Sequence, residues 1–119
     1  MGKLTALLNL AQARTRELGF PYAGALTPEE AYEVLQLAPG AKLVDVRTRA
    51  EWDWVGRIPG AEEIEWQSYP DNQPNSFFLA QLKQQVDPES LVMFICRSGV
   101  RSRKAAALAS HAGYNGCYD

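Results

Sequence analysis

Five consecutive apolar residues, Leu91 to Ile95, constrain the fold of this chain more than any other segment. An unbroken apolar run of this kind is typical of a strand that is buried on both faces of a parallel sheet. The segment from Cys96 to Ser102 follows directly and reads Cys-Arg-Ser-Gly-Val-Arg-Ser, and a helix-like stretch then extends to about Ala112. The sequence therefore predicts a central strand, a short glycine-containing loop and a helix in succession.

The rest of the chain repeats this alternation of strands and helices. Two capping boxes, Thr27 to Glu30 and Thr48 to Glu51, each place a threonine three residues before a glutamate and so mark helix starts. Apolar spacing and turn residues predict further helices and strands: helices at about 3–18, 28–37, 77–86 and 102–112, and strands at 42–46, 61–66, 91–95 and 114–118. Short connections between alternating strands and helices indicate an α/β fold with a parallel sheet covered by helices on both faces.

Length and charge narrow the class of protein. A chain of 119 residues has room for one ordinary domain. Its net charge of −2 gives no global positive field, so we expect neither nucleic acid nor a membrane surface as a partner. No apolar stretch reaches the roughly 20 residues of a membrane span. Because two cysteines and one histidine are too few for a disulfide framework or a metal site, we expect no metal, no cofactor and a cytoplasmic location.

The Cys96 thiol lies in a locally basic segment between a buried strand and a helix start. Four of the twelve basic residues fall within eight positions: Arg97, Arg101, Arg103 and Lys104. A helix start and nearby cations lower the pKa of a thiol, and the thiolate is the reactive form of cysteine. Successive backbone N–H groups in such a loop also form a concavity that binds anions. These features alone are compatible with redox, phosphoryl or sulfur chemistry.

Three segments, in this order, resemble the rhodanese-like (sulfurtransferase) domain: Leu43-Val44-Asp45-Val46-Arg47 with Glu51-Trp52, then Gly56-Arg57-Ile58-Pro59-Gly60-Ala61, then Cys96 to Ser102. The helix entry Leu26-Thr27-Pro28-Glu29-Glu30 is similar as well. The resemblance implies a rhodanese-like three-layer domain over residues 23–119, with a five-stranded parallel sheet. Residues 1–22 would form an extra helical extension before it.

Two features depart from the pattern of the family. The family commonly has histidine before Ile-Pro-Gly-Ala, and this chain has Arg57, which keeps a polar group at that position. Family domains usually continue past the last strand into a further helix, whereas this sequence ends at Asp119. Either the chain is truncated there, or the leading helix at 3–18 covers part of the sheet that the further helix would cover.

The resemblance implies that Cys96 is the catalytic nucleophile of sulfane-sulfur transfer. Its thiolate would attack the outer sulfur of an anionic donor such as thiosulfate, release sulfite and hold the sulfur as a persulfide. A thiol, cyanide or a protein acceptor would then take the sulfur. The residues expected to bind the donor and the persulfide are Arg97, Ser98, Gly99, Val100 and Arg101, with support from Ser102, Asp45, Arg47 and Arg57.

Other functions remain open at this point. Cysteine phosphatases need Cys-x5-Arg, while Arg101 gives Cys-x4-Arg, so the tighter loop favours a single sulfur atom over a phosphate or an arsenate. Rhodanese domains also serve as non-catalytic modules or sulfur carriers for a protein partner, although usually where the loop cysteine is lost. Arginines in the loop favour thiosulfate over 3-mercaptopyruvate as donor.

Three residues outside the loop have alternative interpretations. Cys117, in the last predicted strand, is expected in the core, with a resolving thiol as the alternative. Asp45 and Arg47 follow a strand end, where they would either orient the loop or form a structural ion pair with Glu51.

Overall fold

Four parallel strands form the sheet in the computed structural model of the chain, which describes residues 2–119. They are β1 (Lys42–Asp45), β2 (Glu62–Glu63), β3 (Leu91–Ile95) and β4 (Gly116–Tyr118), in the order β2-β1-β3-β4. Strand β3 has a neighbour on each side, as its apolar sequence predicted. All pairings are parallel, so the carboxyl ends of the strands meet at one edge of the sheet.

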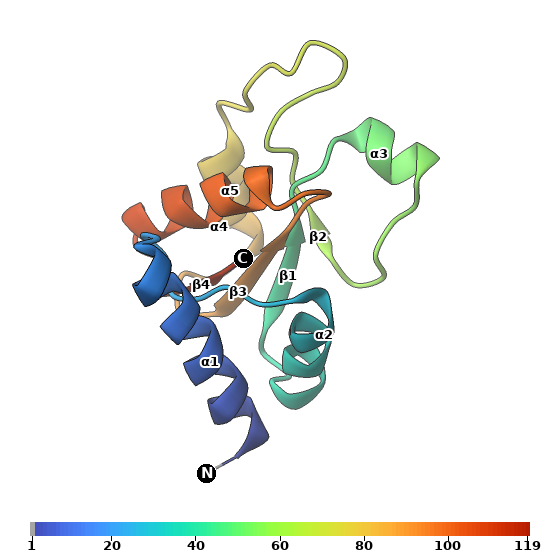
Figure 1. The fold of residues 1–119 in the computed structure, drawn as a ribbon. Helices are drawn as coiled ribbons and strands as arrows, with labels where there is room; N and C mark the ends of the chain where they lie inside the picture. Colours follow the sequence, from blue (N-terminus) through green and yellow to red (C-terminus); the bar gives the residue numbers. More distant parts are fainter. Residues whose placement is uncertain (1) are drawn as a thin grey trace.

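Helices cover both faces of this sheet, which confirms the three-layer α/β architecture (Figure 1). The structure contains α1 (Lys3–Leu18), α2 (Pro28–Leu37), α3 (Arg49–Trp54), α4 (Phe78–Gln85) and α5 (Val100–His111). Helices α1 and α2 pack on one face, and α4 and α5 pack on the other. Both predicted capping boxes are present, at the starts of α2 and α3.

Alternate side chains of β3 enter the two halves of the core. Val92 and Phe94 pack with residues of α4 and α5, whereas Met93 packs with residues of α1 and α2. All three side chains are almost completely buried. This two-residue period is the ordinary consequence of strand geometry, and it explains why the run had to be apolar at every position.

The sheet has four strands in the described residues, not the five that the family resemblance implied. The segment before α2 lies beside β4 but forms only a single bridge, between Gly24 and Tyr118. Backbone bonds join Ala23 N to Cys117 O (3.0 Å) and Leu26 N to Asp119 O (2.8 Å). Pairing does not extend further because Ala25 N–H donates instead to Ala11 O of α1, and the chain then turns into the Thr27 cap.

Helix α1 covers the edge of the sheet beside β4. Ala11 is fully buried there, and Gln12 Nε2 donates to the Tyr118 hydroxyl at 3.0 Å. The Thr15 hydroxyl donates to Ala23 O at 2.9 Å. The leading helix therefore shields both the bridging segment and β4.

Gly24 allows α1 and β4 to approach each other closely. A Cβ atom at this position would lie 2.6 Å from the Tyr118 ring and 2.9 Å from a backbone atom of Ala11. We expect Gly24→Ala to lower the free energy of unfolding by about 2 kcal/mol or more, because the helix must move away from the sheet. Urea denaturation measures this change. Gly40→Ala is the control, since nothing lies within 4 Å of its added Cβ, and equal stability of the two variants would contradict the packing described here.

Strand β2 is shorter than the predicted strand at 61–66, although the residues that follow it continue to hydrogen-bond to the β1 segment. Ile64 N–H donates to Asp45 O and Trp66 N–H donates to Val46 O. Ile64 and Trp66 both pack against the core on the α4 and α5 face. Among residues 2–119, no helix is long and apolar enough to cross a membrane.

Candidate active site

The loop that begins at Cys96 lies where the carboxyl ends of β1, β3 and β4 meet. Asp45 is paired with Ile95 across β1 and β3, and Tyr118 is paired with Met93 across β3 and β4. Polar residues that follow the strands are therefore brought together with the thiol although they are far apart in the sequence. Ligands of open α/β sheets characteristically bind at this edge.

Backbone and side-chain groups of the loop converge on the Cys96 sulfur. Gly99 has a left-handed backbone (φ 91°), as the expected tight curvature requires, and its N–H donates to Cys96 Sγ at 3.0 Å. The Ser102 N–H donates to the same atom at 3.4 Å, and the Ser102 hydroxyl lies 3.4 Å from it. The sulfur thus sits at the start of α5, which begins at Val100.

The surroundings of Cys96 favour its ionised form. Partial burial raises the pKa of the thiol and is the largest single influence. Hydrogen bonds from the Ser102 hydroxyl and from the backbone N–H groups of Ser102, Gly99 and Ser98 act in the opposite direction and together outweigh it. The pKa of Cys96 therefore lies below its ordinary value, for a reason that is mainly hydrogen bonding.

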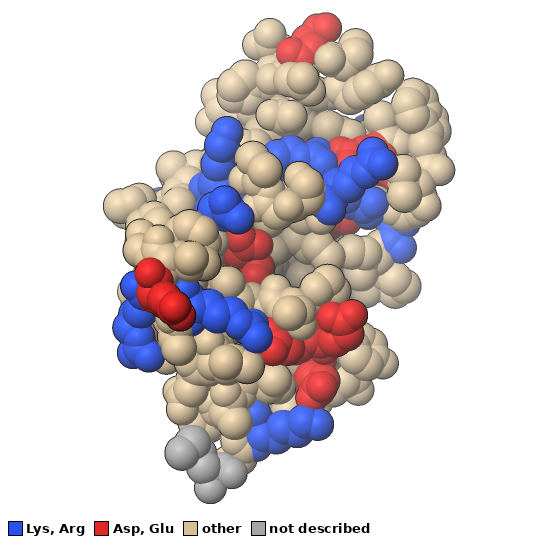
Figure 2. Space-filling model, viewed as in Figure 1, with Lys and Arg blue, Asp and Glu red and all other residues tan. Residues whose placement is uncertain are grey.

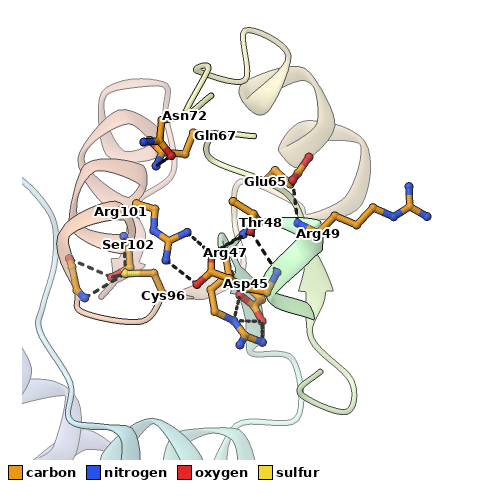
Figure 3. A network of polar contacts seen from close by, with 12 residues as sticks. Asp45, Arg47, Thr48, Arg49, Glu65, Gln67, Asn72, Cys96, Arg101 and Ser102 are labelled. Carbon is orange, nitrogen blue, oxygen red and sulfur yellow. Dashed lines mark hydrogen bonds and ion pairs between the residues drawn. The ribbon is translucent and has the colours of Figure 1, made fainter. Parts of the chain in front are cut away.

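Arg101 faces the thiol, but its charge is balanced by Glu51. The guanidinium donates two hydrogen bonds to this carboxylate, at 2.6 and 3.0 Å (Figure 3). Glu51 also caps α3 by accepting from the backbone N–H and the hydroxyl of Thr48. The Cys96 loop and the start of α3 are thereby locked together. This pairing is consistent with a lowered pKa of Cys96 that derives mainly from hydrogen bonds, whereas the sequence had suggested the arginine charges as a main cause.

Arg47 forms its ion pair with Asp45, and the predicted pair with Glu51 is wrong. The Arg47 side chain reaches back over the end of β1, where its Nη2 lies 2.8 Å from Asp45 Oδ2 and donates to Gly56 O. The Asp45 side chain is fully buried. Glu51 forms its ion pair with Arg101 instead. Arg101 lies 50 positions away in the sequence and is brought near by the parallel pairing of β1 with β3. The buried Asp45 carboxylate thereby holds the Arg47 guanidinium in place beside the site.

Two cavities open on either side of Cys96. One, of about 410 Å³, is lined partly by the cations Arg47, Arg57 and Arg97. The other, of about 280 Å³, runs between the loop and the start of α2 and is lined by apolar residues such as Leu43 and Met93, with Arg97 and Asp119 as its charged lining residues. Arg97 therefore borders both cavities, and we call the first, with three arginines, the basic cavity and the second the apolar cavity.

The remaining predicted site residues differ in how exposed they are and in whether their charges are paired. Arg97 and Ser98 are exposed, and Val100 is half exposed. Arg57 lines the basic cavity, although its guanidinium is paired with Asp53 and Glu63. In the space-filling view, basic side chains gather on one part of the surface with acidic ones among them, so this face is not uniformly cationic (Figure 2).

Cys117 is fully buried and packs in the core against β3 and α5, as predicted. Burial raises the pKa of its thiol to about 11. Both cysteines are free thiols. No group of three or more His, Cys, Asp or Glu side chains in the described chain is placed to hold a metal ion.

Two groups near Cys96 were not identified from the sequence. Glu51 was predicted as a helix cap and as an ion-pair partner after the first strand, but its pairing with Arg101 depends on a long-range contact and was missed. Asp119, whose carboxylate accepts from the Ser102 hydroxyl at 3.0 Å, follows the last strand. Its place at the carboxyl edge of the sheet beside β3 was the one signal that could have identified it.

The Glu51–Arg101 pair predicts an acid-sensitive stability. Hydrogen bonds from Arg101 hold the pKa of Glu51 at about 2, below its ordinary 4.5. Stability from this depressed pKa is fully present above about pH 4.5 and is lost as the pH falls toward 2; it corresponds to about 3 kcal/mol. We expect Glu51→Gln to lower the free energy of unfolding at pH 7, and its difference from wild type to shrink as the pH falls below 4.5.

Urea denaturation at several pH values measures this difference. Asp53→Asn is the matched control, because it removes an ion pair whose two side chains are half exposed, and it should change stability little. A Glu51→Gln difference that stays constant from pH 7 to pH 3 would contradict the role of the charge.

Comparison with known proteins shows the family of this chain. A family model described as "Rhodanese-like domain" matches residues 27–119. An uncharacterized protein of Rickettsia rickettsii is 38% identical over 96 residues, which cover 76% of this chain and 74% of that protein. A similar protein of Rickettsia prowazekii is 37% identical over 94 residues, with the same coverage.

Two solved structures are also similar. The crystal structure of Rv0390 from M. tuberculosis is 40% identical, has a TM-score of 0.69, and covers 82% of this chain and 76% of that chain. The solution structure of a polysulfide-sulfur transferase homodimer from Wolinella succinogenes is 25% identical, has a TM-score of 0.61, and covers 98% of this chain and 77% of that chain.

Proposed function

The chain belongs to the rhodanese-like domain family, and from that premise we propose that it is a sulfurtransferase whose Cys96 receives and passes on a sulfane sulfur. In the first step the Cys96 thiolate attacks the outer sulfur of thiosulfate. The S–S bond of the donor breaks, sulfite leaves with the bonding electron pair, and Cys96 becomes a persulfide. In the second step a thiolate or cyanide attacks the outer sulfur and the Cys96 thiolate is restored.

The observation that supports this proposal most strongly is the direction of the N–H groups around the sulfur. Gly99 N–H and Ser102 N–H both point at Cys96 Sγ. They stabilise the negative charge of the Cys96 thiolate, which attacks the donor in the first step and leaves in the second, and a well-placed preorganised donor stabilises developing charge by about 2.7 to 4 kcal/mol. The short Cys-x4-Arg spacing of the loop favours one sulfur atom over a phosphate.

The basic cavity supports an anionic donor. Arg97 lines this cavity and forms no ion pair with any described residue, so its charge is available to a ligand, unlike the paired charges of Arg47 and Arg57. Thiosulfate carries two negative charges and fits this side of the site. The similarity to a polysulfide-sulfur transferase makes polysulfide the second donor to consider.

The apolar cavity supports an acceptor of a different character. It also borders Cys96, and its charged lining residues are Arg97, shared with the basic cavity, and Asp119; the apolar remainder suits a thiol acceptor, either small or on a protein. Cys96 and Cys117 are both free thiols, which favours a reducing compartment such as the cytoplasm.

A donor panel tests the proposal. The protein is incubated with thiosulfate, polysulfide or 3-mercaptopyruvate, and the intact mass is followed for the gain of one sulfur atom per chain. We expect thiosulfate or polysulfide to transfer sulfur, and Arg97→Ala to raise the thiosulfate concentration for half-maximal transfer about three- to tenfold, since one unpaired contact to a charge is worth about 1 kcal/mol. Arg16→Ala, on the exposed side of α1, is the control. A protein that gains sulfur from no donor would overturn the proposal.

A further inference from the structure

The Ser102 hydroxyl stands at the centre of three competing contacts. It lies 3.4 Å from Cys96 Sγ, 3.2 Å from Gly99 O and 3.0 Å from Asp119 Oδ1. The Ser102 residue is almost completely buried, so water does not supply further partners. A hydroxyl group has one hydrogen to donate. Ser102 can therefore donate to the sulfur only by giving up a bond to one of the two oxygens.

Asp119 is the strongest of these competitors. Its carboxylate is an ionic acceptor, and such hydrogen bonds are roughly twice as strong as neutral ones. Its second oxygen accepts from the Tyr22 hydroxyl at 3.0 Å, which holds the carboxylate in place. Asp119 forms no ion pair with any described residue, so the two hydroxyls are its side-chain partners.

The protonation state of Cys96 decides which contact Ser102 makes. While Cys96 is a thiol, its S–H donates to the Ser102 oxygen, and the Ser102 hydrogen goes to Asp119. When Cys96 loses its proton, the sulfur can only accept, and Ser102 can add its hydroxyl to the two backbone N–H donors only by turning its hydrogen from Asp119 to the sulfur. Stabilising the thiolate thus leaves Asp119 without one of its donors.

We propose that Asp119 is a positioning residue that acts through Ser102: by drawing the Ser102 hydrogen to itself, it holds Cys96 toward the protonated form and limits how far the loop stabilises the thiolate. The consequence for turnover, which rests on the proposed function, is a more reactive sulfur, because a thiolate that is stabilised too strongly is a poorer nucleophile.

The other charges around the thiol do not take this role. Those that face it from the surrounding elements are Asp45 and Arg47 after β1, Glu51 on α3, and Arg97 and Arg101 in the loop and on α5. Four of them form two mutual ion pairs, and Arg97 is exposed to solvent. The Arg103 charge acts to lower the pKa of Tyr22, which is the second hydrogen-bond partner of Asp119. Asp119 is thus the acidic group near Cys96 whose charge is not already balanced by an arginine.

The test measures the rate of Cys96 alkylation by iodoacetamide against pH, because this reagent reacts with the thiolate and needs no sulfur donor. Mass spectrometry assigns the modified cysteine. We expect Asp119→Asn to shift the midpoint of the profile down by about one pH unit. In the Ser102→Ala background the same substitution should shift it by less than half as much. No shift, or an equal shift in both backgrounds, would overturn the proposal, and neither outcome depends on sulfur transfer.

A second variant keeps the proposal testable if Asp119→Asn folds poorly. Tyr22→Phe removes the other hydroxyl from Asp119, which leaves the carboxylate more dependent on Ser102. The alkylation midpoint should then move up, opposite to the effect of Asp119→Asn. A downward shift in Tyr22→Phe would contradict the competition for the Ser102 hydrogen, and circular dichroism confirms that each variant is folded.

Discussion

Replacing Cys96 with serine is expected to reduce thiocyanate formation from thiosulfate and cyanide to the uncatalysed background, a loss of about a thousandfold or more. A serine hydroxyl does not ionise near neutral pH and forms no persulfide. The loop would keep its shape, because Gly99 and Ser102 N–H groups find an oxygen where the sulfur was. Colorimetric measurement of thiocyanate follows the reaction.

Cys117→Ser is the matched control for this variant. Its thiol lies in the core and donates to Tyr114 O, away from the loop hydrogen bonds that surround Cys96. We expect it to retain turnover, with some loss of stability from a polar group in the core. Substantial turnover in Cys96→Ser, or its complete loss in Cys117→Ser under conditions where that variant is folded, would contradict the assignment of the nucleophile.

Replacing Arg47 with methionine is expected to have the largest effect on stability, a loss of about 3 to 5 kcal/mol. The Asp45 side chain is fully buried, and its charge is balanced by the Arg47 guanidinium. Without that group the carboxylate keeps, among the described residues, only the backbone N–H of residue 47 as a hydrogen-bond partner. Since a domain of this size has about 5 to 15 kcal/mol of total stability, a large part of it would be lost. Urea denaturation at pH 7 measures the change.

Two further variants separate the buried charge from the loss of the side chain itself. Asp45→Leu combined with Arg47→Met removes both charges, and we expect it to recover part of the lost stability. Arg57→Met removes an arginine whose ion pairs are exposed, and it should change stability little. If Arg47→Met is no less stable than Arg57→Met, the Asp45–Arg47 pair does not stabilise the site as described.

Features that depend on neighbouring residues were predictable from the sequence. The capping boxes at Thr27 and Thr48, the buried strand at Leu91–Ile95 and the turn at Gly99 all formed as expected. Each of these features is determined by hydrogen bonds within one short segment or by the apolar residues of that segment. The thiol at a helix start belongs to the same class, because the strand, the loop and the helix are consecutive.

Features that depend on partners far apart in the chain were not predictable in the same way. Arg47 and Arg101 both lie within reach of a carboxylate, and only the packing of α3 against the loop decides that Glu51 pairs with Arg101. The prediction of a fifth strand was wrong for a similar reason. The Ala25 N–H donates to α1, and a single bridge at Gly24 remains beside β4. Asp119 reaches Ser102 only because β4 lies beside β3.

Peptide mapping of thiosulfate-treated protein tests the central claim most directly. The protein is alkylated after treatment and digested, and the peptide that holds the additional sulfur is identified by mass spectrometry. We expect one extra sulfur atom on Cys96, none on Cys117, and its loss on addition of cyanide. Sulfur found on Cys117, or on neither cysteine after treatment with thiosulfate and with polysulfide, would contradict the account.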